Sequence, residues 1–181
     1  MRINGAGGST ANLRSTPMPA IHCAMRPELR PDSPASSNAL LARASGLKLA
    51  ALAGSDARPL MGKHLALVCQ QEAPDSELFR QAGVGLGARV TTLRPTLSDA
   101  SSHAEVVRTS RLLSRLYDAV ECQGIEPRVV RQIRTAADIP IFEGVASSGH
   151  PSAHLVAQLG GTDLRANRLF IVQAILLEGI R

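Results

Sequence analysis

The stretch His64-Leu-Ala-Leu-Val-Cys69 is a short apolar run that follows Gly62 and precedes a polar segment. An apolar run of this length between glycine and polar positions is typical of a strand that is buried on both faces of a sheet. Further short segments of this kind, rich in β-branched or apolar residues, lie at 89–93, 117–122 and 139–142. The sequence therefore predicts four strands.

Segments with helical spacing separate the predicted strands. Apolar residues recur every three or four positions in 75–86, 103–116 and 127–137, and helices are also predicted at 37–52 and 164–178. Strands that alternate with helices of this length form βαβ units, whose strands are parallel. The predicted fold class is therefore α/β, in three layers, with a four-stranded parallel sheet and helices on both faces.

Residues 1–36 have a different composition from the rest of the chain. They contain five of the eleven prolines, show no apolar period, and hold no acidic residue before Glu28. Such a segment buries too little apolar surface to offset its ordering entropy, so we predict a disordered tail before a domain over 37–181. The tail lacks the apolar core of a Sec signal. Its acid-free, arginine- and serine-containing start is typical of a transit peptide or a bacterial type III secretion signal, and an uninformative tail is the third interpretation.

Charge and composition exclude some classes of partner. The 181 residues carry a net charge of +5, but residues 1–58 hold seven basic and three acidic side chains, so the remainder is nearly neutral. Aromatic residues make up only 2% of the chain. Nucleic-acid-binding domains usually have a basic face and aromatic side chains for base stacking, so we do not expect a nucleic-acid partner. No apolar run is long enough to cross a membrane.

Cysteine and histidine patterns give no metal or disulfide signature. The three cysteines, Cys23, Cys69 and Cys122, are odd in number and form no Cys-x-x-Cys pair, which favours buried free thiols in a reducing compartment. His150 and His154 have the spacing of a helical metal pair, but no third ligand accompanies them. We predict neither a metal nor another cofactor.

Several longer motifs follow one another along the chain. They are Leu60-Met-Gly-Lys-His-Leu-Ala-Leu-Val, Arg111-Leu-Leu-Ser-Arg-Leu-Tyr-Asp-Ala-Val120, Ile139-Pro-Ile-Phe-Glu-Gly144, His150-Pro151 and Asn167-Arg-Leu-Phe-Ile-Val-Gln-Ala-Ile-Leu. Their order resembles the carbamoyl-phosphate-binding domain of the aspartate/ornithine carbamoyltransferase family over most of residues 38–181, and the motif ending at Val120 is the most specific piece. The last segment is similar to the family's C-terminal helix, which packs back across the first domain. The resemblance implies self-association as a trimer.

The same resemblance locates a ligand cleft. The matching positions are Ala73, Pro74, Asp75, Ser76 and Glu77 after the first strand, Gln123 after the third, and His150 with Pro151. The family binds phosphate with arginines at the first of these places, where this chain has two acids. By resemblance, His150 is the single candidate catalytic group. Gly83-Val-Gly-Leu-Gly87 lies at a helix end and is interpreted as a turn, because a phosphate loop would lie between a strand and a helix.

A second departure concerns the amino-acid-binding domain of the family. Only about fifteen residues separate His150-Pro151 from the last predicted helix, whereas a further domain needs roughly 100 residues. We therefore predict a degenerate carbamoyltransferase-like domain that lacks this second domain.

Two functional hypotheses follow. The first is a binding or interaction module without transferase activity, located in the bacterial cytoplasm or delivered by a type III system into a host cell, where a host protein would be its partner. The alternative is an active enzyme of this family with a modified carbamoyl-phosphate site or another ligand. In that case Arg80, Arg108 or Arg111 would supply replacement cations.

Overall fold

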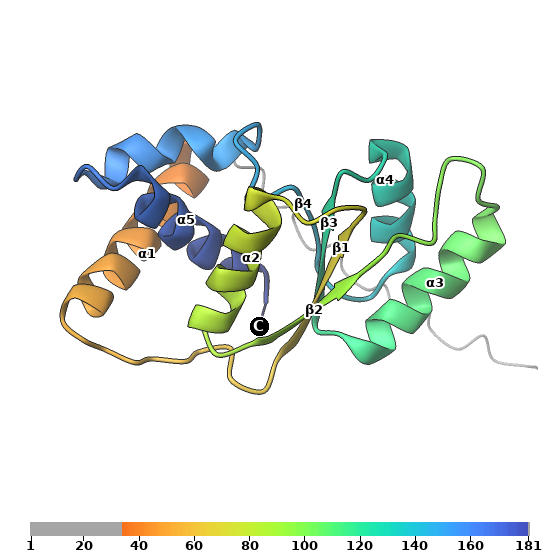
Figure 1. The fold of residues 1–181 in the computed structure, drawn as a ribbon, viewed down its shortest axis with the longest axis horizontal. Helices are drawn as coiled ribbons and strands as arrows, with labels where there is room; N and C mark the ends of the chain where they lie inside the picture. The colour runs from red at the N-terminus through yellow and green to blue at the C-terminus, as the bar shows by residue number, and fades with distance from the viewer. Residues whose placement is uncertain (1–33, 181) are drawn as a thin grey trace, which may run out of the picture.

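The computed structural model describes residues 34–180, and their strands and helices alternate along the chain (Figure 1). The elements are α1 (Pro34–Leu52), β1 (His64–Cys69), α2 (Pro74–Gly85), β2 (Arg89–Leu93), α3 (His103–Leu116), β3 (Ala119–Gln123), α4 (Pro127–Ala136), β4 (Ile141–Glu143), the 3₁₀ helix η1 (Pro151–Leu159) and α5 (Leu164–Gly179).

The four strands form one parallel sheet in the order β2-β1-β3-β4. The register pairs His64 with Arg89 across β1 and β2, and Leu65 with Ala119 across β1 and β3. All neighbouring pairs are parallel, which confirms the predicted fold class. The central position of β1 explains its apolar sequence, because both of its faces are covered.

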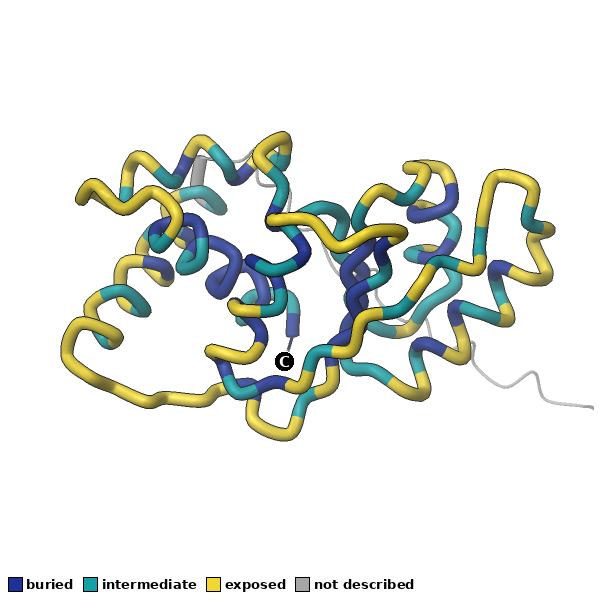
Figure 2. Tube along the Cα trace, in the orientation of Figure 1, coloured by how far each residue is buried: buried dark blue, intermediate teal, exposed yellow. Residues whose placement is uncertain are grey.

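Helices cover both faces of the sheet, and side-chain alternation along β1 assigns the two cores. Leu65 and Leu67 belong to the core shared with α1, α2 and α5, whereas Ala66 belongs to the core under α3 and α4. Figure 1 shows these two helical layers on opposite sides of the strands, and Figure 2 shows β1 and β3 as the buried centre of the sheet. The result is the predicted three-layer arrangement.

Some predicted boundaries differ from the structure. Helix α1 begins at Pro34, so residues 34–36, predicted to belong to the tail, form its start. The remaining tail, residues 1–33 including Cys23, lies outside the described residues. Strands β3 and β4 begin two residues later than predicted, and η1 was not predicted at all. No helix within residues 34–180 is long and apolar enough to cross a membrane.

The glycine-rich end of α2 is a packing and turn feature, as predicted. A Cβ atom added at Gly83 would lie 2.8 Å from a methyl carbon of Val90, so this glycine lets α2 approach β2 closely. Gly87 has a φ of +91°, a conformation that other residues rarely adopt, and it reverses the chain between α2 and β2.

A capping box starts α3. The Ser102 hydroxyl accepts a hydrogen bond from the Glu105 backbone N–H at 3.3 Å, and the Glu105 carboxylate accepts one from the Ser102 N–H at 2.8 Å. Ser102→Ala removes the first bond and is expected to reduce the free energy of unfolding by about 1 kcal/mol, measured by urea denaturation. Thr135→Ala serves as the control, because the Thr135 hydroxyl only bonds back to Arg131 within α4. Equal stability of both variants and the wild type would contradict this role of the cap.

Candidate ligand site at the carboxyl ends of β1 and β3

The strand order creates a switch point at the carboxyl ends of β1 and β3, where the ligand cleft is expected from the sequence resemblance. The chain leaves β1 for β2 on one side, whereas β3 lies on the other side of β1, so the connections diverge at the carboxyl ends of β1 and β3. Ligands of open parallel sheets bind at such a switch point. The start of α2 follows β1 there, and Gln123 ends β3. The structure thus brings together the residues that the sequence singled out after these two strands.

Hydrogen bonds join the first turn of α2 to the end of β3. The Ser76 hydroxyl accepts from the Ala73 N–H at 3.3 Å and donates to the Gln123 side-chain oxygen at 2.7 Å. The Gln123 amide donates to the Asp75 carbonyl at 3.3 Å. Ser76 is fully buried. These polar groups therefore bond one another across the position where a ligand would enter.

Glu121 extends this network into the sheet. Its Oε1 atom accepts hydrogen bonds from the Gln123 amide at 3.2 Å and from the Val145 N–H at 3.0 Å, while its Oε2 atom has no partner. Complete burial raises the pKa of Glu121 to about 8, and the charges of Glu143 and Asp75 add to the rise. The carboxyl is therefore mostly protonated at neutral pH. Since Oε1 accepts both bonds, Oε2 is the atom that carries the proton.

Arg168 of α5 holds the loop that follows β4. Its guanidinium donates to the carbonyls of Val145 at 2.8 Å and Ser147 at 2.6 Å, and to the Ser152 hydroxyl at 3.2 Å. The side chain is buried, and burial lowers the pKa of Arg168 while the charge of Asp75 raises it. Only its Nε atom lacks a partner. Arg168 was not among the predicted site residues, although an arginine directly before the apolar run of a predicted helix was a detectable signal.

His150 caps η1 and is neutral. Its Nδ1 atom accepts from the Ser152 N–H at 3.2 Å and lies 2.8 Å from the Ser152 hydroxyl. Burial, followed by the charge of Arg168, lowers the pKa of His150 to about 4. With Nδ1 accepting, the ring proton is on Nε2. Pro151 occupies the first position of η1 and is exposed, so it shapes the loop without contributing a polar group.

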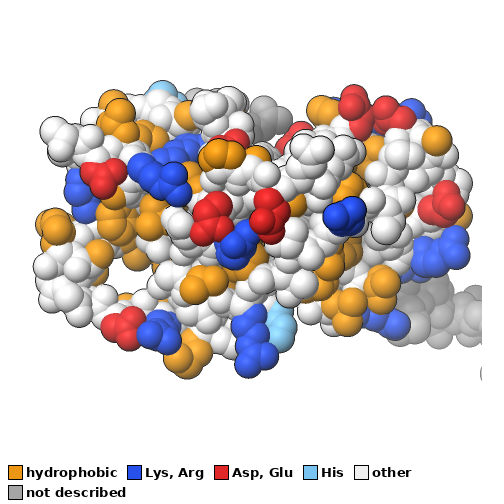
Figure 3. All heavy atoms as spheres, viewed as in Figure 1, with side chains coloured by type: hydrophobic (Ala, Val, Ile, Leu, Met, Phe, Trp, Pro, Cys, Tyr) orange, Lys and Arg blue, Asp and Glu red, His pale blue; other side chains and the backbone are white. Residues whose placement is uncertain are grey.

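The carboxylates at the start of α2 differ in their pairing. Glu77 forms an ion pair with Arg80 at 2.6 Å, and Arg80 also contacts Glu72 at 3.2 Å. Asp75 forms no ion pair within the described residues. Figure 3 shows acidic and basic side chains next to one another over α2. The Asp75 carboxylate therefore has no ion-pair partner within the described residues, and the Arg168 charge is the cation that acts on it.

The three replacement cations considered from the sequence do not complete the cleft. Arg80 is held by its two carboxylate partners, which keep it on the surface of α2. Arg108 and Arg111 lie on α3, in the helical layer on the other side of the sheet. That part of the prediction was wrong, because the helical layers had not been assigned to the two faces. The cation that does lie at the cleft is Arg168.

Two cysteines and His154 are buried or hydrogen-bonded outside the candidate site. Burial raises the pKa of the Cys122 thiol to about 12, so it is not a nucleophile at neutral pH. The Nδ1 atom of His154 lies 2.6 Å from the Pro151 carbonyl. Within residues 34–180, no group of three or more His, Cys, Asp or Glu side chains is placed to hold a metal. Cys69 and Cys122 are free and buried, as predicted.

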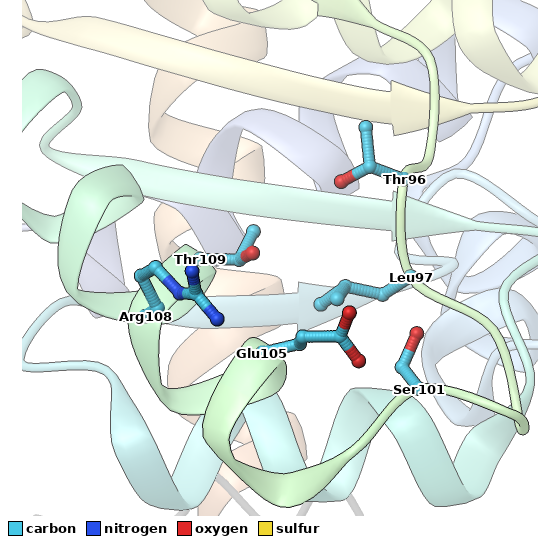
Figure 4. Close-up of a pocket in the computed structure, with 6 residues that line it drawn as sticks. All are labelled: Thr96, Leu97, Ser101, Glu105, Arg108 and Thr109. Carbon is cyan, nitrogen blue, oxygen red and sulfur yellow. The ribbon is translucent and has the colours of Figure 1, made fainter.

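A separate hollow lies between the loop after β2 and the first turns of α3. Figure 4 shows Thr96 and Leu97 of the loop facing Glu105 and Arg108 of the helix. The capping hydrogen bonds of Ser102 hold Glu105 and lower its pKa. Because the carboxylate is already used by the cap and is fully exposed, this hollow offers no activated acid or base.

Asp118, in the motif at 111–120, has a structural role at the amino ends of β1 and β3. Asp118 accepts hydrogen bonds from the His64 N–H at 2.8 Å and from the Lys63 ammonium at 3.1 Å. The bond from the His64 backbone is the largest cause of the lowered pKa of Asp118. These contacts fix the starts of β1 and β3 relative to each other, at the end of the strands away from the cleft.

Comparison with known proteins identifies relatives of this chain. No family model matches the chain. An ornithine carbamoyltransferase of Actinobacillus pleuropneumoniae is 33% identical over 117 residues, which are 64% of this chain and 35% of that protein. A catabolic ornithine carbamoyltransferase of Mycoplasma capricolum is 30% identical over 136 residues, 75% of this chain and 44% of that protein. This chain contains a carbamoyltransferase-like domain.

Solved structures confirm the fold of the carbamoyltransferase-like domain. It matches ornithine carbamoyltransferase from Pyrococcus furiosus with a TM-score of 0.55 and 24% identity, over 61% of this chain and 36% of that one. It matches the catalytic subunit of M. jannaschii aspartate transcarbamoylase with a TM-score of 0.56 and 21% identity, over 70% of this chain and 42% of that one. The chain thus spans less than half the length of these relatives. Between the described β4 and α5 it has only η1 and its flanking turns.

Proposed function

We propose that the carbamoyltransferase-like domain is a binding or interaction module without transferase activity. The observation that carries this proposal is the unpaired Asp75 carboxylate in the first turn of α2, together with Glu77. A carboxylate and a phosphate charge about 5 Å apart repel each other by about 3 kcal/mol at an effective dielectric constant near 20. By resemblance, the family uses attractive arginines at the same place.

The hydrogen-bond network at the cleft supports the same proposal. A ligand oxygen at the start of α2 would compete with the Ser76–Gln123 bond, and the Ala73 N–H already bonds the Ser76 hydroxyl. Arg168, the cation of this cleft, uses three hydrogen bonds to hold the loop after β4. Binding a dianion would require these groups to exchange existing partners for the ligand, which reduces the net gain.

A second candidate function is an active enzyme with a modified ligand site. The observation that favours it is that Arg168 of α5 and the neutral His150 before η1 both contact the Ser152 hydroxyl. A neutral imidazole with its proton on Nε2 can donate a hydrogen bond to a carbonyl oxygen. This candidate needs a ligand of lower negative charge than a phosphate, because Asp75 would face it.

A transferase assay separates the two candidates. The full chain, incubated with carbamoyl phosphate and either ornithine or aspartate, is expected to form no carbamoylated amino acid above the rate without protein. The controls are an active carbamoyltransferase and the His150→Ala variant. Product formation that saturates with carbamoyl phosphate and disappears in His150→Ala would contradict the proposed function.

Three further parts of the hypothesis stay predictions. Delivery into a host cell rests on the composition of residues 1–33, which lie outside the described part of the chain. A host protein as partner rests on that delivery. Trimer formation rests on the resemblance of the domain to carbamoyltransferases.

A further inference from the structure

A groove of about 510 Å³ runs between α3 and α4, in the helical layer away from α1, α2 and α5. Its α3 side is formed by His103, Val107 and Arg111, which follow one another at intervals of four residues and so lie along one side of that helix. Its α4 side includes Arg128 and Arg131. The groove extends for about 12 Å along α3, at 1.5 Å per residue.

The arginines of this groove have no counter-charge on the described chain. Arg111, Arg128 and Arg131 are exposed, and none forms an ion pair or a side-chain hydrogen bond within residues 34–180. The groove lining contains no carboxylate. The N-cap of α4, Glu126, forms no ion pair with Arg128 or Arg131. Seven other arginine or lysine side chains of the described residues form ion pairs or hydrogen bonds. Other exposed arginines of the described chain are also unpaired, so the distinguishing feature is that three of them line one groove.

We propose that the α3–α4 groove binds an acidic peptide segment of a partner protein, whose carboxylates pair with Arg111, Arg128 and Arg131. The guanidinium groups match carboxylates in charge and geometry. Val107 and Ala136 add an apolar floor between them, which suits peptide side chains and not a sugar–phosphate backbone. This inference gives a partner class to the binding role proposed above and rests on that role.

Two other occupants fit the groove less well. The tail of the same chain holds Arg2, Arg14, Arg26 and Arg30 against only Glu28 and Asp32, so its charge has the same sign as the groove. A nucleic acid would need basic groups beyond one groove, whereas residues 59–181 are close to neutral. The groove residues include no aromatic side chain for base stacking. Charge complementarity therefore favours an acidic peptide.

The test is fluorescence anisotropy with the full chain and a labelled peptide of about eight alternating Glu and Ala residues, long enough to span the groove. Arg128→Glu with Arg131→Glu is expected to weaken binding by about ten-fold or more. The matched control, Arg94→Glu with Arg165→Glu, makes the same change in net charge at exposed arginines outside the groove and is expected to weaken binding less than about two-fold.

Three results would overturn the proposal: no binding of the acidic peptide, equal weakening in both double variants, or tighter binding of a short duplex DNA than of the peptide. If the charge-reversed variant does not fold, Arg128→Gln with Arg131→Gln removes the cations without adding acids, and the same comparison applies. The proposed lack of transferase activity is read out separately by the transferase assay. A failure of one proposal is therefore distinguishable from a failure of the other.

Discussion

Glu121→Gln is expected to make the protein more stable than the wild type at pH 9, by on the order of 3–5 kcal/mol. The reason is the complete burial of Glu121, whose Oε2 atom has no partner, which raises its pKa from the ordinary 4.5 to about 8. Between pH 4.5 and about 8 the folded state keeps the proton on the Glu121 carboxyl, whereas the unfolded state releases it. The contribution of the protonated group is thus complete below pH 4.5 and is lost as the pH rises to about 8.

The glutamine variant keeps the hydrogen bonds that Glu121 makes and cannot ionise. Its side-chain oxygen can still accept from Gln123 and from the Val145 N–H. Urea denaturation at a series of pH values should show two curves that coincide near pH 4 and separate steadily up to about pH 8. Glu126→Gln, at an exposed N-cap, is the control and should follow the wild type. Parallel curves for Glu121→Gln and the wild type would mean that Glu121 is ionised in the folded protein.

Arg168→Met is expected to reduce the free energy of unfolding by about 2–4 kcal/mol. The methionine fills part of the volume but donates nothing to the carbonyls of Val145 and Ser147. Val145 is buried, so its carbonyl oxygen would be left without a donor. Urea denaturation measures the loss, and hydrogen exchange should show faster opening of the loop after β4.

Two variants on α5 separate the role of the planar guanidinium of Arg168, with its several N–H donors, from the role of its positive charge. Arg168→Lys keeps the positive charge but cannot serve two carbonyls and Ser152 in the same planar arrangement, so it should recover only part of the loss. Arg165→Met, at an exposed position one turn earlier on α5, should change stability little. If Arg168→Met is as stable as the wild type, the guanidinium does not hold the loop. The Arg168 side chain of the wild type would then be available to bind a ligand.

The apolar pattern of the sequence was sufficient to predict the fold class. Strands buried on both faces give short apolar runs, and amphipathic helices between them give a clear period, as in α3. The apolar spacing of 103–116 does not by itself show which positions are buried, because Leu116 at the last turn of α3 is 57% exposed. The 3₁₀ helix η1 was missed because short helices of this kind have no strong apolar period.

The candidate site was only partly accessible from the sequence. The resemblance located Ser76, Gln123 and His150, and the strand order explains why the first two meet. Glu121 and Arg168 were missed, because linear spacing does not show which side chains converge across 47 residues of sequence. Both nevertheless left a signal in the sequence, namely a charged residue within a predicted buried strand or helix.

The most direct test of the central claim is a calorimetric titration of the full chain with carbamoyl phosphate near neutral pH. We expect no binding with a dissociation constant below about 0.1 mM, which corresponds to about 5.5 kcal/mol, because Asp75 repels the phosphate at the start of α2. Asp75→Asn should strengthen any residual binding. A dissociation constant below that value in the wild type, weakened by Arg168→Lys and unchanged by Asp75→Asn, would contradict the account.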